Sequence, residues 1–170
     1  MVKFTRIWEM PNKNTFDIRC INKFVHSYAD QAAVSIDPFA NKNKIAKITN
    51  DLDPDFSCDY NLDAFDFLKT FENESVDLVL FDPPFSPRQI SECYKKFGRT
   101  VNMQTTQSSF WSKLKDEIAR IVKIDGTVLC FGWNTNGVGK TRGFELIEIM
   151  TVAHGGNHND TLCTAERKIK

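Results

Sequence analysis

Residues 76–85 read Val-Asp-Leu-Val-Leu-Phe-Asp-Pro-Pro-Phe, and this stretch decides how the chain folds. Its first six residues form a nearly continuous apolar run, which is typical of a parallel strand that is buried on both faces. Pro83 and Pro84 end the run, because proline cannot donate a hydrogen bond to a neighbouring strand. The stretch therefore predicts a central parallel strand that stops abruptly at Asp82.

On both sides of this strand, apolar strand-like runs alternate with helical or loop segments, which indicates an α/β sheet. Upstream we expect strands at residues 34–37, 45–49 and 58–60, then a short helix at 62–68. Downstream the apolar spacing predicts a helix from Ser108 to about Asp125 and a strand at 127–131. Residues 144–152 and 161–165 should form an antiparallel pair at a sheet edge. The expected fold is a three-layer Rossmann-like α/β domain with a mostly parallel sheet.

Composition favours one globular domain over residues 1–170, because 41% of the residues are hydrophobic and 14 are phenylalanine. The 22 basic and 22 acidic residues balance, so binding of a polyanion would need a local basic strip, an oligomer or a partner protein. Five cysteines without CxxC spacing indicate a reduced, cytoplasmic protein. The N-terminal residues lack the apolar segment of an export signal, and no run is long enough to cross a membrane.

Acidic residues follow the predicted strands at Asp37, Asp51, Asp63 and Asp82. Ligands of open α/β sheets bind beyond the carboxyl ends of the strands. One such acid alone is more typical of a loop cap than of a site. Four of them together predict a ligand site at this end of the sheet.

The sequence at Asp82, Pro83, Pro84 and Phe85 fits chemistry on an aromatic amine. The lone pair of a base amine is delocalised into the ring, which makes the nitrogen a poor nucleophile. The Asp82 carboxylate and the Pro83 carbonyl could accept its two hydrogens and free the lone pair for attack on a methyl sulfonium. Phe85 could stack on an extruded base, or it could be a core residue behind the two prolines.

At this point the sequence resembles the amino-methyltransferase family of DNA methylases, whose motif is Asp, Asn or Ser, then Pro-Pro, then Tyr, Phe or Trp. The resemblance spans roughly residue 34 to the C-terminus. It implies a class I S-adenosylmethionine-dependent fold and methylation of adenine N6 in DNA, because cytosine enzymes commonly begin the motif with Ser. It also implies a small bacterial or phage member that acts in the cytoplasm of a bacterium or a phage-infected cell.

The resemblance also implies a set of cofactor-binding residues. Asp37, Pro38, Phe39 and Ala40 look like the motif after the first strand. Asp51, with Leu52, would bind the ribose hydroxyls, and Asp63, with Ala64, would meet the cofactor adenine.

The glycine-rich loop of the family is missing, because residues 41–44 read Asn-Lys-Asn-Lys. Asp51 also follows Asp37 by only 14 positions (51 minus 37), against roughly 20 in the usual fingerprint. We therefore expect the helix after the first strand to be absent or vestigial. A methionine carboxylate could then meet backbone N–H groups or Lys42.

Two further segments have open interpretations. Residues 8–16, within an N-terminal segment 1–33, resemble the stretch that closes over the cofactor in related methylases, although a turn there would also place Trp8 and Phe16 in the core. Residues 86–107 form a long connection that either faces the nucleic acid or is a solvated charged surface. With Phe85, the substrate-binding candidates in it are Arg88, Lys95, Lys96 and Arg99.

Two other motifs are set aside. His154, His158 and Cys163 lack the spacing of a zinc site, so we expect no metal. Residues 137–141 (Gly-Val-Gly-Lys-Thr) lack the leading glycine of a phosphate-binding loop. Alternatives to a DNA adenine enzyme are the same fold acting on RNA adenine or a protein glutamine, and an inactive binding or inhibitory relative.

Overall fold

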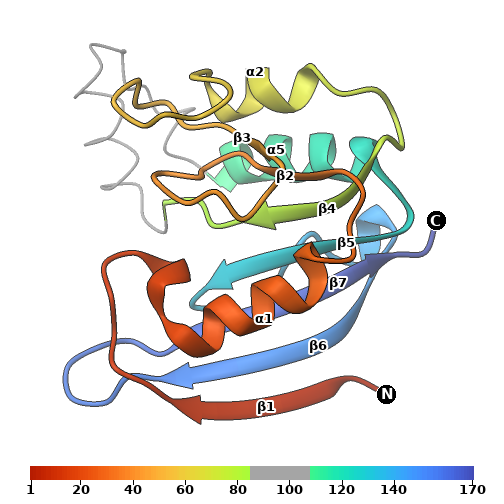
Figure 1. Ribbon diagram of the computed structural model, residues 1–170. Helices are drawn as coiled ribbons and strands as arrows, with labels where there is room; N and C mark the ends of the chain where they lie inside the picture. Colours follow the sequence, from red (N-terminus) through yellow and green to blue (C-terminus); the bar gives the residue numbers. More distant parts are fainter. Residues whose placement is uncertain (85–107) are drawn as a thin grey trace.

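The computed structural model describes residues 1–84 and 108–170 (Figure 1). Within these residues, seven strands form one sheet in the order β1-β6-β7-β5-β4-β2-β3. The strands are β1 (Lys3–Trp8), β2 (Ser35–Asp37), β3 (Ile48–Thr49), β4 (Val76–Phe81), β5 (Val122–Gly132), β6 (Phe144–Ala153) and β7 (Thr161–Lys168). The helices are α1 (Arg19–Ala29), α2 (Ala64–Lys69) and α5 (Ser108–Ile121), with 3-10 turns η1 (Thr15–Asp17) and η2 (Lys140–Arg142).

The sheet is mostly parallel, as predicted. β7 runs antiparallel to both of its neighbours, β5 and β6, while the other neighbouring strands run parallel. The predicted antiparallel pair therefore exists as β6 and β7. It does not form the sheet edge, because β1 lies outside β6 with Lys3 opposite Glu148.

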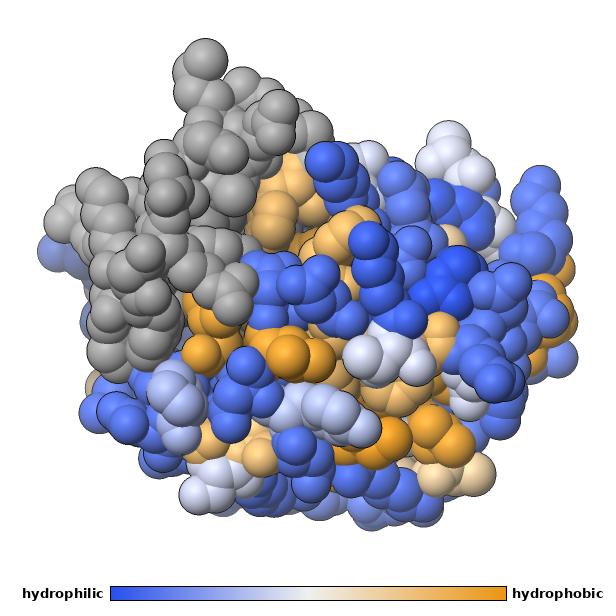
Figure 2. All heavy atoms as spheres, turned by 90° about the horizontal axis from the view of Figure 1, so that it is seen from above, coloured by the Kyte–Doolittle hydropathy of each residue, from blue (hydrophilic) through white to orange (hydrophobic). Residues whose placement is uncertain are grey.

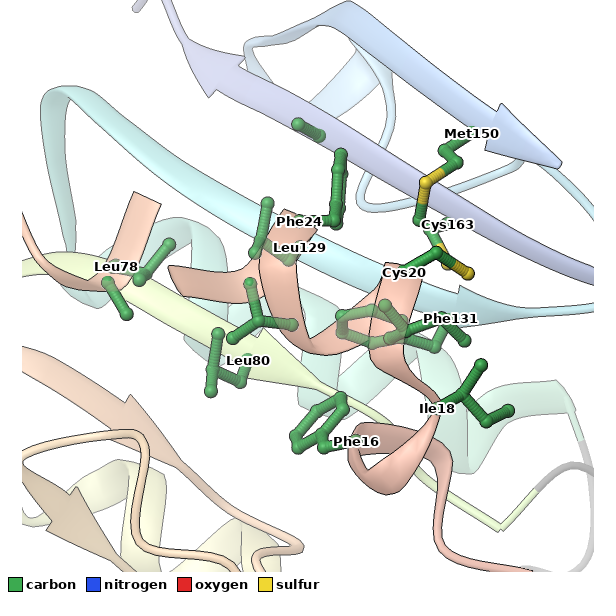
Figure 3. Close-up of a cluster of buried hydrophobic side chains, with 14 of the residues drawn as sticks. Phe16, Ile18, Cys20, Phe24, Leu78, Leu80, Leu129, Phe131, Met150 and Cys163 are labelled. Carbon is green, nitrogen blue, oxygen red and sulfur yellow. The ribbon is translucent and has the colours of Figure 1, made fainter. Parts of the chain in front are cut away.

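Helices cover both faces of the sheet and bury two cores. On one face, α1 places Ile21, Phe24 and Val25 against the sheet, and this cluster includes Leu80 and Phe131 (Figure 3). On the other face, α2 and α5 pack against alternate residues of the same strands. The apolar residues of α5 recur at helical spacing, which is why its position could be predicted. The three-layer arrangement is confirmed.

Two predicted strands are shorter than expected, because side chains replace ladder partners. The N–H of Lys47 donates to the Ser35 hydroxyl at 3.0 Å, so β3 keeps only Ile48–Thr49 of the predicted run 45–49. The Asp59 carboxylate accepts from the N–H of Thr49 at 2.8 Å. The predicted strand 58–60 is therefore reduced to an isolated bridge between Asn50 and Tyr60.

The helix predicted to end near Asp125 instead ends at Ile121. β5 begins at once, because Val122 pairs with Val76 of β4. The next pair joins Leu78 to Thr127, so residues 123–126 bulge out of the ladder, with Asp125 at a φ of 65°.

Residues 38–47 contain no helix, as predicted from the missing glycine loop. Asn41 adopts a φ of 54° in this loop, a left-handed conformation that asparagine tolerates better than most residues. Seen from above, the surface shows apolar islands between hydrophilic side chains (Figure 2). No helix in the described part of the chain is long and apolar enough to cross a membrane.

Candidate active site at the carboxyl ends of the strands

Asp37 and Asp82 lie at the carboxyl ends of the neighbouring parallel strands β2 and β4. Asp37 is fully buried and accepts hydrogen bonds from the N–H of Phe39 at 2.9 Å and from Asn43 Nδ2 at 3.1 Å. Burial raises the pKa of Asp37 to about 7, against the opposing effect of these hydrogen bonds, and the charge of Asp82 adds to the rise. The two carboxyl groups are thus close enough to interact electrostatically.

Asp82 follows β4 directly and is only partly exposed. Its Oδ1 atom is buried and has no hydrogen-bond partner among the described residues. Burial raises the pKa of Asp82 to about 6, and a hydrogen bond with the Thr15 side chain acts in the opposite direction. A buried acceptor without a donor destabilises the folded protein, so such atoms in native structures require an explanation. Binding of a ligand that donates a hydrogen bond to Oδ1 is one such explanation.

A cavity of about 200 Å³ opens beside Asp82 on the side of β2. Its other walls are residues 13–17 and residues 39–43. The N-terminal segment therefore borders this cavity, and its closing over a cofactor stays a prediction. Phe16 lines the cavity and is also a core residue, with its ring 4.9 Å from that of Phe131 (Figure 3). The alternative prediction that Trp8 lies in the core is wrong, because Trp8 is 64% exposed.

The loop that replaces the glycine-rich turn is fixed by Asp51. The Asp51 carboxylate accepts from the N–H of Asn41 at 2.8 Å and from the N–H of Asp53 at 2.9 Å. Burial raises the pKa of Asp51, while these two hydrogen bonds lower it. Lys42 Nζ lies 3.4 Å from Asp17 Oδ2, which joins the loop to the N-terminal segment. Asp51 thus positions residues 39–43 around the cavity.

The remaining predicted cofactor residues lie at differing distances from this cavity. Phe39 and Ala40 line it, whereas Pro38 is buried behind it and accepts from Asn50 Nδ2 at 3.0 Å. Asp63 caps α2, since its carboxylate accepts from the N–H of Phe65 at 3.0 Å. Ala64 belongs to the core and Leu52 is half-buried. Neither Asp63 nor Ala64 lines the cavity, so their contact with cofactor adenine stays a prediction.

A larger cavity, of about 390 Å³, lies on the β5 side of β4. Pro83 and Pro84 form part of its wall, and the end of β5 with the residues after it forms another part. The side chains that line it from α5 and from the loop after β5 include Trp111, Lys115, Trp133 and Arg142. The two cavities thus flank the Asp82-Pro83-Pro84 segment.

The loop after β5 is held in place from two sides. The buried Glu166 carboxylate accepts from the N–H groups of Val138 and Gly139. Arg142 donates to Asp116 Oδ1 at 2.6 Å and to Ser112 Oγ at 2.8 Å, which ties the loop to α5. The Gly-Val-Gly segment is therefore a nest for a carboxylate of this chain rather than a phosphate loop.

Sequence reasoning missed the residues of the larger cavity. Trp111 lies within the predicted helix that begins at Ser108, and residues 134–143 follow the predicted strand at 127–131, so neither pattern indicates a ligand site. A signal was present, because Trp133 comes just after the buried run 127–131, where strand ends carry ligand sites. Five predicted substrate residues lie outside the described residues: Phe85, Arg88, Lys95, Lys96 and Arg99.

Both ring nitrogens of His154, one of the three residues in the histidine and cysteine motif near the C-terminus, lie within hydrogen-bond distance of protein atoms. His154 Nδ1 lies 2.7 Å from the carbonyl oxygen of Glu9, and Nε2 lies 2.9 Å from Thr161 Oγ1. Among residues 1–84 and 108–170, no group of three or more His, Cys, Asp or Glu side chains could hold a metal ion. His154 instead joins the ends of β1, β6 and β7.

Comparison with known proteins supports the fold. No protein-family model and no curated protein matches the sequence. Among solved structures, the 1,6-didemethyltoxoflavin-N1-methyltransferase of Burkholderia thailandensis, with bound 1,6-didemethyltoxoflavin and S-adenosylhomocysteine, has a TM-score of 0.59 and 11% identity over 89% of this chain and 78% of its own. The N-methyltransferase NodS of Bradyrhizobium japonicum WM9, in complex with S-adenosylhomocysteine, has a TM-score of 0.57 and 11% identity over 94% and 90%.

TrmN from Thermus thermophilus has a TM-score of 0.57 and 17% identity, and the match covers 89% of this chain but 49% of TrmN. Identities this low show a shared fold and nothing finer. The fold is the Rossmann-like α/β fold of these methyltransferases, and the described cavities lie where such sheets bind ligands, beyond the carboxyl ends of the strands.

Proposed function

We propose that this protein transfers a methyl group from S-adenosylmethionine to the exocyclic amino nitrogen of a nucleic-acid base, adenine N6 in DNA foremost. One observation carries the proposal. Asp82 Oδ1 is a buried acceptor without a donor among the described residues. Asp82 lines the smaller cavity at the end of β4, and the next residues, Pro83 and Pro84, line the larger one. An amine that donates to this atom would sit between a cofactor on one side and the rest of its base on the other.

The smaller cavity suits the methionine end of the cofactor. Lys13, Asn14 and Asn43 are polar groups in its wall, and they could meet a carboxylate and an ammonium group. The fold neighbours that bind S-adenosylhomocysteine support the same cofactor here. When bound, the cofactor supplies a methyl group on a positively charged sulfur, so the reaction requires neither a metal nor a general base of high pKa.

Asp82 orients the amine and increases its reactivity. Its ionised carboxylate accepts one N–H, and the Pro83 carbonyl is the candidate acceptor for the other. Drawing both hydrogens away from the plane of the ring localises the nitrogen lone pair toward the methyl group. Only the ionised form of Asp82 can accept on both oxygens, so its raised pKa of about 6 makes the reaction depend on pH.

Replacement of Asp82 tests the proposal. Asp82→Ala should lower the rate of methyl transfer to adenine oligonucleotides on the order of a hundredfold or more, because one preorganised acceptor is lost. Thermal melts and calorimetric titration with S-adenosylhomocysteine should show a folded protein that still binds cofactor. Asp55→Ala, a change at an exposed site, is the matched control. The wild-type rate should also rise as the pH increases through about 6.

Labelled cofactor incubated with separate DNA, RNA and protein pools identifies the substrate class. Methylation of protein alone, or near-normal turnover by Asp82→Ala, would contradict the assignment. Because residues 1–170 carry no net charge, we also propose that an oligomer or a partner protein contributes to target recognition.

A binding protein that has lost the cofactor is the second candidate, and the loop after β2 favours it. Residues 38–47, which connect β2 to β3, contain no helix, and the Asp51 carboxylate already accepts from two backbone N–H groups. Calorimetry separates the two candidates, since a binding relative would release no heat with S-adenosylhomocysteine at high concentration.

A further inference from the structure

The larger cavity contains a cation that has no carboxylate partner among the residues that the structure describes. Lys115 lines the cavity from α5 and is only partly exposed. Within the described part of the chain it makes no hydrogen bond or ion pair, although the charge of Glu166 lies close enough to act on it. A partly buried ammonium group without a direct partner is a favourable position for an anion.

The acidic groups near Lys115 are used elsewhere. Glu166 accepts from the backbone of Val138 and Gly139. Asp116, the next residue on α5, pairs with Arg142 at 2.6 Å. Arg142 also lines the cavity, but its guanidinium is fixed by Asp116 and Ser112. Among the described residues of this wall, Lys115 is therefore the cation whose charge a ligand can use.

Aromatic and proline surfaces complete the cavity. Trp111 precedes Lys115 by one helical turn, so both side chains lie on the same face of α5. Trp133 lines the cavity from the end of β5 and is 54% exposed. Flat rings beside a basic group are the combination that binds single-stranded nucleic acid, because rings stack on bases and cations contact phosphates. The cavity volume of about 390 Å³ falls in the range of small-ligand sites.

We propose that this cavity takes one unstacked nucleotide, with Trp133 stacking on a base and Lys115 contacting a backbone phosphate. The inference rests on the proposed function and narrows it, because it selects a nucleic acid over a protein glutamine as substrate. A glutamine side chain carries no anion and no ring, so neither Lys115 nor Trp133 would act on it. The residues concerned are also distinct from the basic candidates in residues 86–107.

Direct binding of labelled single-stranded oligonucleotides tests the inference without requiring turnover. Anisotropy titrations of full-length protein at several salt concentrations give the slope of log affinity against log salt. Lys115→Gln should weaken binding and reduce the steepness of that slope by about 0.7, the value for one lost phosphate contact on a single strand. Lys115→Arg should restore the slope. Lys113→Gln is the matched control, because Lys113 is an exposed lysine on the same helix that does not line the cavity.

Trp133→Ala should weaken binding roughly 5- to 150-fold, as expected for one lost base stack, while Trp133→Phe should retain most of the affinity. Thermal melts verify that each variant is folded. DNA and RNA strands of the same sequence are titrated in parallel. The strand that the protein binds with higher affinity shows whether the nucleotide comes from DNA or from RNA. A glutamine-containing peptide forms a third arm.

The outcomes distinguish this inference from the proposed function. If wild type methylates DNA while Lys115→Gln and Trp133→Ala bind oligonucleotides as wild type does, the cavity assignment is wrong and the enzyme assignment stands. If the variants lose binding as described but wild type transfers no methyl group, the cavity assignment stands and the enzyme assignment is wrong. Failure of wild type to bind either strand, or tighter binding of the peptide, overturns the inference.

Discussion

Replacing Asp37 by asparagine should remove a pH dependence of stability that the fold creates. Asp37 is fully buried, and burial raises its pKa to about 7 from an ordinary value of 3.8. Between these two values the folded protein holds the carboxyl group neutral, whereas the unfolded chain has it ionised. The folded state therefore binds one more proton than the unfolded state in this window.

The sign of the effect follows from this difference. Stability falls as the pH rises wherever the folded state binds more protons, by about 1.4 kcal/mol per pH unit for one group. The contribution of Asp37 is fully present below pH 3.8 and is lost as the pH rises through about 7. Between pH 5.5 and pH 7.5 it should decrease by about 2 kcal/mol.

Urea denaturation of wild type and Asp37→Asn at pH 5.5, 6.5 and 7.5 measures this contribution. The variant amide can still accept from the N–H of Phe39, but Asn43 would have to turn its amide over to accept from the new amide. It would then give up the hydrogen bond from the N–H of Ile45, 3.2 Å long, and its own donation to the Ala40 carbonyl, 2.7 Å long. The loss of these two hydrogen bonds costs roughly 1–3 kcal/mol and is the same at every pH. The diagnostic quantity is therefore the change with pH in the difference between the two proteins.

The exposed residue Asp55 provides the control, because Asp55→Asn should track wild type at all three pH values. If the free energy of unfolding of Asp37→Asn differs from that of wild type by the same amount at pH 5.5 and pH 7.5, the raised pKa is refuted. If wild type instead gains stability relative to Asp37→Asn as the pH rises from 5.5 to 7.5, the sign of the linkage is refuted as well.

Two further perturbations test the site. Asp51→Ala should weaken S-adenosylhomocysteine binding in calorimetry by roughly 1.5–3 kcal/mol, because it removes a charged acceptor that positions residues 39–43. Oligonucleotide binding should be unchanged. Equal cofactor affinity of variant and wild type would mean that Asp51 is the wrong acid. Gly137→Ala should destabilise the fold by roughly 3 kcal/mol in urea, because a Cβ there would clash with the Glu166 carboxylate, which the N–H groups of Val138 and Gly139 hold in place, and φ is 48°. Gly156→Ala, at a φ of 57° with open space around it, should cost only about 1–2 kcal/mol, and equal losses would refute the steric account.

The central strand and the main helices could be predicted from the sequence because each depends on local pattern. β4 occupies the predicted residues, since a strand buried on both faces needs an uninterrupted apolar run and the two prolines end it. α5 begins at the predicted Ser108 and buries Leu114, Ile118 and Ile121 at helical spacing. These signals are contained within ten or so residues.

β1 could not be predicted because its evidence lies far along the chain. Phe4 and Trp8 are exposed while Ile7 packs against the core, so the segment has no continuous apolar run. Its partner is β6, where Phe4 lies opposite Ile149. Pairing of this kind depends on the assembled sheet and leaves little trace in the local sequence.

The candidate site was predicted in part. The strand-end rule brought Asp37 and Asp82 together correctly, because β2 and β4 are adjacent. It could not show that Asp63 caps α2, since the cap depends on where the helix begins. The larger cavity was missed because its walls come from α5, the end of β5 and the residues around Pro84, which are distant in sequence.

The strand-end acids differ in one respect that the sequence alone explains. Asp37, Asp51 and Asp63 each accept from the backbone N–H two residues later, at 2.9, 2.9 and 3.0 Å. The equivalent residue for Asp82 is Pro84, which has no N–H, and Pro83 before it has none either. The usual local partner of a strand-end carboxylate is therefore missing at this position.

The missing N–H groups explain why the buried Oδ1 of Asp82 has no hydrogen-bond partner within residues 1–84 and 108–170. An aspartate whose own backbone satisfied it would have little reason to bind an amine, because a substrate would have to compete with an existing hydrogen bond. Two prolines in succession remove that competition without an added cavity or charge. The two prolines would thus have a chemical role as well as a conformational one: they end the strand, and they leave the Asp82 carboxylate free to accept one hydrogen of the amine in the proposed reaction.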